Sequence, residues 1–186
     1  MASQLWSWRH LTSYDFPVAL NVSAAHLPSL LAMHGDDPMA RPFSGIRLEI
    51  AETDIIHDFE GARETLNQLR SLGAQIMLDD FGAGYSSLQM LSDLPIDGLK
   101  IDRSYVARIE TDERVRNLVT SLAEFARSTN MIVVAEGVET PRQAEFLTKI
   151  GIDRGQGFLF SEAIDADQFA VLLQRGPLGA KIAGRF

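Results

Sequence analysis

Residues 75–82 read Gln75-Ile-Met-Leu-Asp-Asp-Phe-Gly82, a short apolar run that ends in two adjacent acids and a glycine. The apolar part, Gln75–Leu78, is typical of a parallel strand that is buried on both faces. Before it, apolar residues from Phe59 to Leu72 recur at spacings of three and four, and Gly73 is placed to end a helix. This stretch therefore predicts a helix followed by a buried strand with acids at its end.

The same alternation continues in both directions along the chain. Three further helix starts are predicted at the capping residues Asp112, Thr140 and Asp165. Strand and helix alternating at this spacing indicate βα units and one parallel sheet, which is an α/β fold. The other predicted strands are Val18–Val22, Ile46–Ile50, Gly98–Ile101, Ile132–Ala135 and Gly155–Phe160.

Composition limits the kind of protein and its partners. The chain has no cysteine, which excludes disulfides, thiolate metal sites and a cysteine nucleophile. Its net charge is −8 and its basic residues are scattered, so we expect no long nucleic acid as partner. No apolar run reaches the length of a membrane span and no secretory signal is visible, so we expect a cytoplasmic protein without a membrane segment.

Polar side chains stand at or just after the end of nearly every predicted strand. In a parallel α/β barrel the active site forms at the C-terminal ends of the strands, so these residues are expected to meet at one rim. They are Asn21, Glu49, Glu52, Asp79, Asp80, Lys100, Asp102, Glu136 and Glu139, and Gln156 is added at the beginning of the last predicted strand.

Each of these residues alone has an ordinary structural explanation. Asn21 can form a turn, an Asp-Asp pair can cap a helix, Glu136 and Glu139 can be exposed, and Lys100 can form a salt bridge. Several acids at one rim would repel each other unless cations lie among them. Oxygen ligands without cysteine or a histidine pair favour Mg²⁺ or Mn²⁺.

Two such ions, bridged by one acid of the Asp79-Asp80 pair, can stabilise the attacking and the leaving oxygen when a phosphodiester is hydrolysed. Lys100 can orient the attacking water or stabilise the developing negative charge. The glycines after Asp80 match neither the dinucleotide-binding fingerprint nor the P-loop. No serine lies in a Gly-x-Ser-x-Gly nucleophile elbow, so serine-hydrolase chemistry is not expected.

Six ordered motifs resemble the EAL domain of bacterial cyclic di-GMP phosphodiesterases, from about Ala2 to Leu173. They are Leu20-Asn-Val-Ser23, Leu48-Glu-Ile-Ala-Glu-Thr53, Leu78-Asp-Asp-Phe-Gly-Ala-Gly-Tyr-Ser-Ser-Leu88, Leu99-Lys-Ile-Asp-Arg-Ser104, Val134-Ala-Glu-Gly-Val-Glu-Thr140 and Gln156-Gly-Phe-Leu-Phe-Ser161.

The resemblance implies a two-metal hydrolase that converts cyclic di-GMP to linear pGpG with Mg²⁺ or Mn²⁺. It makes Asn21, Glu49 and Asp79 ligands of one metal, and Asp79, Asp80 and Glu136 ligands of the second. It makes Lys100 the residue that positions the water, and Glu52 the acid that anchors the loop after Asp80. It places Asp102, Glu139 and Gln156 near the substrate or the metal-bound waters.

The resemblance also predicts the architecture: a TIM-barrel-like, EAL-type parallel barrel that lacks its first two strands and keeps six βα units. Residues 1–17 are expected to be the end of an N-terminal helix and a loop, residues 18–175 the truncated barrel, and residues 176–186 a tail. The Glu-Ala-Leu motif that names the family is absent.

The missing strands leave open a longer parent protein, strand exchange, or a homodimer through the open side. The loop and helix after Asp80 resemble the family's dimerisation element, so the resemblance implies a homodimer there as an alternative. Three classes of function stay open. The chain is a phosphodiesterase, an inactive module that binds cyclic di-GMP or another protein, or a metal-dependent barrel enzyme acting on a sugar phosphate or phosphodiester lipid.

Overall fold

The computed structural model describes residues 17–32, 42–56, 58–82, 88–152 and 154–174. Six parallel strands form one sheet in chain order, each beside the next. They are β1 (Val18–Asn21), β2 (Ile46–Ala51), β3 (Gln75–Phe81), β4 (Gly98–Ile101), β5 (Ile132–Glu136) and β6 (Arg154–Gln156). The predicted parallel α/β sheet with six βα units is confirmed.

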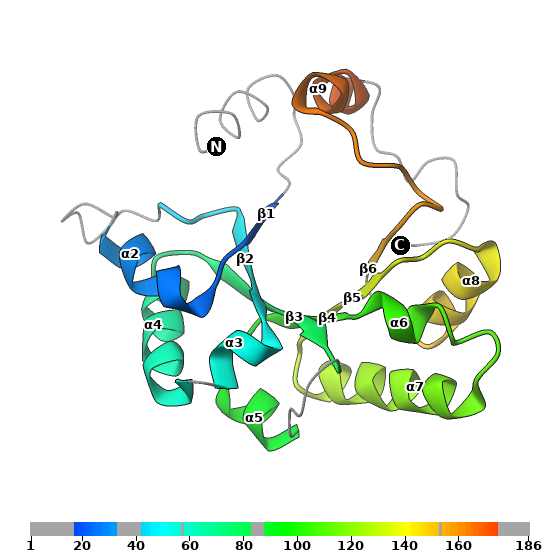
Figure 1. The fold of residues 1–186 in the computed structure, drawn as a ribbon, viewed down its shortest axis with the longest axis horizontal. Helices are drawn as coiled ribbons and strands as arrows, with labels where there is room; N and C mark the ends of the chain where they lie inside the picture. The colour runs from blue at the N-terminus through cyan, green and yellow to red at the C-terminus, as the bar shows by residue number, and fades with distance from the viewer. Residues whose placement is uncertain (1–16, 33–41, 57, 83–87, 153, 175–186) are drawn as a thin grey trace.

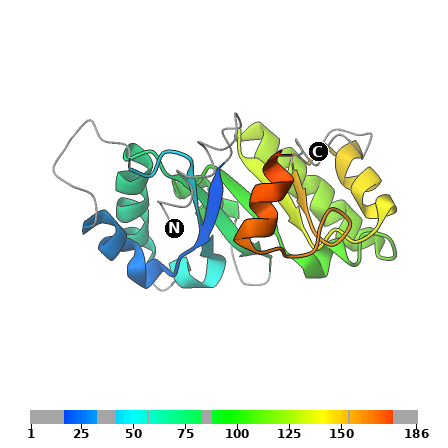
Figure 2. The same ribbon diagram turned by 90° about the horizontal axis from the view of Figure 1, so that it is seen from above.

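The sheet bends into an arc with most of the helices on its outer side, which makes a half-barrel (Figure 1). The first strand, β1, and the last, β6, are the two edges, and within the described residues no strand closes the arc between them. Both views show α9 on this open side (Figure 2). The helices are the short η1 (Ala24–His26), α2 (Leu27–Ala32), α3 (Glu52–Ile56), α4 (Phe59–Ser71), α5 (Leu88–Asp93), α6 (Arg103–Val106), α7 (Glu113–Ser128), α8 (Pro141–Lys149) and α9 (Ala166–Gln174).

Alternate residues of each strand face opposite sides of the sheet, and the two sides differ in chemistry. The outward residues join the helices in one apolar core, in which Leu48, Ile76 and Leu99 are fully buried beside Leu66 of α4 and Val119 of α7. The inward residues include acids, amides and a lysine. Packing of the outward face against the helices explains why its residues are apolar.

The predicted helix boundaries are confirmed by their caps. The side chain of Asp112 accepts hydrogen bonds at the start of α7, and Thr140 and Gln143 form a complete capping box at α8. The predicted reciprocal pair at α9 also forms, because Asp165 and Gln168 each accept a hydrogen bond from the other's backbone N–H.

The last predicted strand is wrong in its extent. The strand was expected over Gly155–Phe160, whereas β6 covers only Arg154–Gln156. The chain turns at Gly157, whose carbonyl accepts a hydrogen bond from the backbone N–H of Phe160. The apolar residues that suggested a longer strand therefore belong to this turn.

Several predictions lie outside the described residues. These are the helix and loop expected for residues 1–16, the tail at residues 176–186, and residues 83–87 of the loop and helix expected after Asp80. Among the helices that the structure does describe, none combines the length and the apolar character needed to cross a bilayer.

Candidate active site

Lys100, near the end of the central strand β4, lies among carboxylates from three other strands. Its Nζ is 2.7 Å from Glu49 Oε2 on β2, 2.9 Å from Asp79 Oδ1 on β3 and 2.6 Å from Glu136 Oε1 on β5. The lysine side chain is only 5% exposed, so these contacts are largely shielded from water. The predicted convergence of side chains from separate strands at one rim is confirmed for these four residues.

The charges at this rim are strongly coupled. Burial alone lowers the pKa of Lys100, but hydrogen bonds to Glu136, Glu49 and Asp79 outweigh it and raise the pKa above its ordinary value. The lysine is therefore charged at neutral pH. One lysine contacts three acids, so its single positive charge leaves the cluster with an excess of negative charge.

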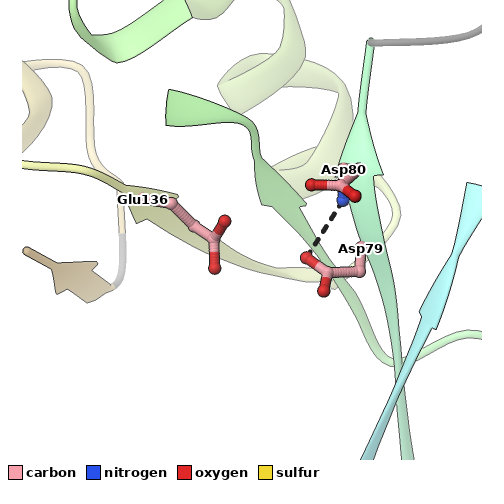
Figure 3. A group of neighbouring side chains, drawn as sticks. All are labelled: Asp79, Asp80 and Glu136. Atoms are coloured by element: carbon pink, nitrogen blue, oxygen red, sulfur yellow. Dashed lines mark hydrogen bonds between the residues drawn. The ribbon is translucent and has the colours of Figure 1, made fainter. Parts of the chain in front are cut away.

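The end of β3 brings a second aspartate to the same rim. Adjacent strand residues normally face opposite sides, but the register between β3 and β4 shifts between Leu78 and Phe81, and Asp80 has a left-handed φ of 54°. The backbone N–H of Asp80 donates to Asp79 Oδ1 over 3.0 Å (Figure 3). This bulge is the reason why two neighbouring acids can serve one site.

Asp79, Asp80 and Glu136 form a set of oxygen ligands that suits a metal ion. One ligand atom from each lies within 4.8 Å of the other two, and the three come from β3 and β5 (Figure 3). Burial raises the pKa of Asp80, and the negative charges of Asp79 and Asp102 raise it further. Burial also raises the pKa of Glu136. A hard divalent cation at this place would favour the charged form of both acids, which burial and the neighbouring negative charges disfavour.

Glu52 is 1% exposed and contacts the backbone beyond the bulge. Its Oε2 accepts a hydrogen bond from the backbone N–H of Gly82 over 3.0 Å. This hydrogen bond joins Glu52 to the segment that follows Asp80, and the anchoring role that the resemblance implies for Glu52 stays a prediction.

Asn21 and Gln156 lie on the two edge strands. In the sheet register Asn21 is the partner of Glu49, and Gln156 is the partner of Glu136, so both stand at the level of the acids. Both are exposed, in contrast to Lys100. The structure brings their backbones to the rim but gives their side chains no described hydrogen bond to the acidic cluster.

Asp102 and Glu139 have local structural contacts. The side chain of Asp102 accepts from the backbone N–H of Ser104 and caps α6, and its charge still reaches Asp80. The backbone N–H of Glu139 donates to Gln143, while its side chain is exposed. Neither side chain belongs to the described acidic cluster around Lys100.

Sequence reasoning missed two residues on the strand–helix units that carry the site. Tyr105 donates a hydrogen bond from its hydroxyl to the carbonyl of Gly82 over 2.7 Å, which no motif spacing revealed. Arg47, on the inward side of β2, is 8% exposed; its Nη2 donates to Gln75, and its Nε has no hydrogen-bond partner among the described residues. The adjacent acids Asp79 and Asp80 could have indicated the bulge, because neighbouring residues of a regular strand point to opposite sides of the sheet.

Comparison with known proteins gives consistent results. The family model described as "EAL domain" matches residues 1–163. An uncharacterised protein of Azorhizobium caulinodans is 43% identical over 81% of this chain, which corresponds to 21% of that protein. The cyclic di-GMP phosphodiesterase PdeR of Escherichia coli is 36% identical over 89% of this chain and 26% of its own length. The chain thus spans about a quarter of the curated relatives that it matches.

Solved structures show the same fold. The EAL domain of Mycobacterium smegmatis DcpA superposes with a TM-score of 0.82 and 34% identity, over 94% of this chain and 81% of that one. The phosphodiesterase PaMucR in complex with c-di-GMP gives a TM-score of 0.78 and 34% identity, over 90% of this chain and 70% of that one. The matched motifs, the half-barrel and these similarities agree, and the chain belongs to the EAL domain family.

Proposed function

We propose that the rim around Lys100 is the metal-binding and catalytic part of a cyclic di-GMP phosphodiesterase site, which hydrolyses the nucleotide to pGpG. One observation carries the proposal: Lys100 Nζ lies within 2.9 Å of carboxylate oxygens from β2, β3 and β5. The three acids outnumber the one lysine, and a cationic ligand would reduce the repulsion among them. Relatives named as cyclic di-GMP phosphodiesterases support the choice of substrate.

The residues proposed to hold the metals are the oxygen donors of this rim. Asp79, Asp80 and Glu136 would hold one ion, and Glu49, Asp79 and Asn21 a second. Two divalent cations, Mg²⁺ or Mn²⁺, would lower the pKa of a bound water and neutralise charge on the phosphate. A solved neighbour from Klebsiella pneumoniae, BlrP1, is titled as a complex with manganese and cyclic di-GMP.

Lys100 has two proposed tasks. Without metal, its three N–H donors can bind the three acids and so hold their side chains near the positions that a ligand needs. When the acids turn to a ligand, an N–H of the ammonium becomes available to orient the attacking water. Because the pKa of Lys100 is raised, it acts as a fixed positive charge and donor.

The proposed reaction is the hydrolysis of one phosphodiester bond. The water oxygen bonds to phosphorus, the bond between phosphorus and the ribose O3′ breaks, and O3′ takes up a proton. The other water proton is passed to a rim carboxylate or to solvent, and the product carries a 5′-phosphate. Asp102, Glu139 and Gln156 are proposed to contact the nucleotide or the waters around it.

Turnover by the purified chain tests this proposal. Incubation with cyclic di-GMP and Mn²⁺ or Mg²⁺ should give pGpG, measured by chromatography. Asp80→Asn should remove the product, while Asp112→Asn, at the residue that caps α7 and outside the acidic cluster, should leave turnover unchanged. Intact nucleotide after long incubation with the unaltered, folded chain would contradict the proposal.

A binding module without turnover is the second candidate, and the edges of the sheet favour it. Asn21 and Gln156 are exposed on β1 and β6, and the chain covers 70% to 81% of the two solved chains compared above. Calorimetric titration separates the candidates. Binding of cyclic di-GMP without metal, and without any pGpG formed, would favour the module.

A homodimer is also proposed, through the loop and helix after Asp80 or through the open side of the half-barrel. Edge strands with unpaired backbone groups favour association. Sedimentation equilibrium should give twice the mass of one chain, and a monomer at high concentration would contradict this proposal.

A further inference from the structure

The backbone of Gly82 is held from both sides by side chains of neighbouring strand–helix units. Its N–H donates to Glu52 Oε2 over 3.0 Å, at the junction of β2 and α3. Its carbonyl accepts from the hydroxyl of Tyr105 over 2.7 Å, on α6 after β4. These two hydrogen bonds, which we call the Gly82 contacts, connect both neighbours of β3 to the segment that follows Asp80.

Gly82 is a position that needs such support. Its φ is +98°, and a glycine has more backbone freedom to lose than any other residue. Two residues earlier, Asp80 holds a φ of 54°, which is unfavourable for a residue with a side chain and persists only where the surroundings impose it. The Gly82 contacts fix the chain directly after the buried Phe81, so they act on the bulge that aims Asp80.

Tyr105 is itself held firmly. The side chain of Asp102 caps α6, and the backbone N–H of Tyr105 donates to the carbonyl of Asp102. The ring lies against Gly82 so closely that a Cβ on the glycine would be 2.6 Å from Tyr105 Cε2. The tyrosine thus contributes ring packing and a separate hydrogen bond, and the two can be separated by removing the hydroxyl alone.

We propose that Tyr105 is a positioning residue for the acidic rim: its hydroxyl, acting with Glu52 on Gly82, holds the bulge in the geometry that brings Asp80 beside Asp79. The described hydrogen bond of the Tyr105 hydroxyl goes to Gly82 and to none of the acids. The expected effect of Tyr105 on the binding of divalent metal rests on the proposed function, whereas its effect on the Gly82 backbone does not.

The variant Tyr105→Phe tests the inference, with Thr148→Val as the matched control. Thr148 also donates a hydroxyl hydrogen bond to a backbone carbonyl, that of Ala144 on α8, over 2.7 Å. Amide hydrogen exchange is measured on the metal-free proteins. We expect Tyr105→Phe to speed exchange at the Gly82 amide by about three- to tenfold, while Thr148→Val leaves that amide unchanged. Equal exchange at Gly82 in Tyr105→Phe and the unaltered chain overturns the inference.

Binding of Mn²⁺ alone, measured by electron paramagnetic resonance, gives the second readout. Tyr105→Phe should weaken Mn²⁺ binding by about three- to tenfold, and Thr148→Val should not. Unchanged Mn²⁺ affinity alongside faster exchange overturns the claim that Tyr105 positions Asp80. If the unaltered chain binds no Mn²⁺, the proposed function fails, and the exchange at Gly82 still decides the role of Tyr105. A variant Tyr105→Leu, which also loses the ring, should show a larger change in both measurements.

Discussion

The central strands and the edge strands of this sheet carry similar polar residues in very different surroundings. All four residues of β4 are buried, and its Lys100 is held by three acids. The residues of β1 alternate between half-buried and exposed, and its Asn21 is exposed. The parallel register brings polar residues of all these strands to the same rim. A side chain is held in one place, as Lys100 is, only where the strand has neighbouring strands on both sides. The comparison predicts where substitutions matter most.

The largest contrast is expected in stability. Leu99 on β4 is fully buried between sheet and helices, whereas Leu20 on β1 is only partly buried. Leu99→Ala should lower the free energy of unfolding by about 2–5 kcal/mol, because it leaves a cavity in the core. Leu20→Ala should cost about half as much or less, since the edge can relax. Urea unfolding measures both, and equal losses would contradict the contrast between centre and edge.

Removal of the central cation should have the next largest effect. Lys100→Met leaves three acids facing each other, and should cost about 2 kcal/mol, less than a fully buried pair because the acids remain partly exposed. Added Mn²⁺ or Mg²⁺ should restore much of this loss, because a cation again lies among the acids. Thermal melting with and without metal measures the recovery.

The matched control is Arg70→Met, which removes an exposed cation from its ion pair with Asp97 on the outer surface. It should lower stability only slightly, and metal should not restore it. A metal-independent loss in Lys100→Met would show that the rim acids do not share a site for a cation.

Metal affinity should separate the centre from the edge as well. Asp80→Asn should weaken Mn²⁺ binding by about tenfold or more, since even substitution of residues that hydrogen-bond to a metal ligand weakens metal affinity by about 10–100-fold. Gln156→Ala, on the exposed end of β6, should change it by about twofold or less. Calorimetry measures both variants, and a larger loss for Gln156→Ala would reverse the assignment.

The smallest effect is expected outside the site, at the start of α7. A hydrogen bond from Arg108 lowers the pKa of Asp112, and bonds from Val115 and Arg114 N–H groups lower it further. A lowered folded-state pKa gives stability that is present above the unfolded value, about 3.9, and is lost as pH falls through the folded value. Asp112→Asn should therefore melt slightly lower than the unaltered chain at pH 7, and the difference should vanish in acid below the lowered pKa. A difference that grows in acid would contradict the cause.

The sequence predicted the central part of the molecule well, because local signals and burial agree there. Short apolar runs gave β4 its bounds, and cap residues such as Asp112 and Thr140 gave helix starts. The meeting of Glu49, Asp79, Lys100 and Glu136 followed from the rule that parallel strands present their ends at one rim.

The remaining features depend on contacts between distant residues, which no local pattern contains. The bulge after Leu78 and the left-handed Asp80 arise from the fit of β3 against its neighbours. The hydroxyl of Tyr105 reaches Gly82 across 23 positions of sequence. The end of β6 was misjudged because its apolar continuation resembles a strand until the turn at Gly157 is seen.

Anomalous diffraction from crystals grown with Mn²⁺ decides whether separate strands hold a metal at this rim. We expect an anomalous peak within bonding distance of carboxylate oxygens from Asp79, Asp80 and Glu136, whose ligand atoms lie within 4.8 Å of one another. A well-ordered rim at saturating Mn²⁺ with no peak between these side chains would contradict it.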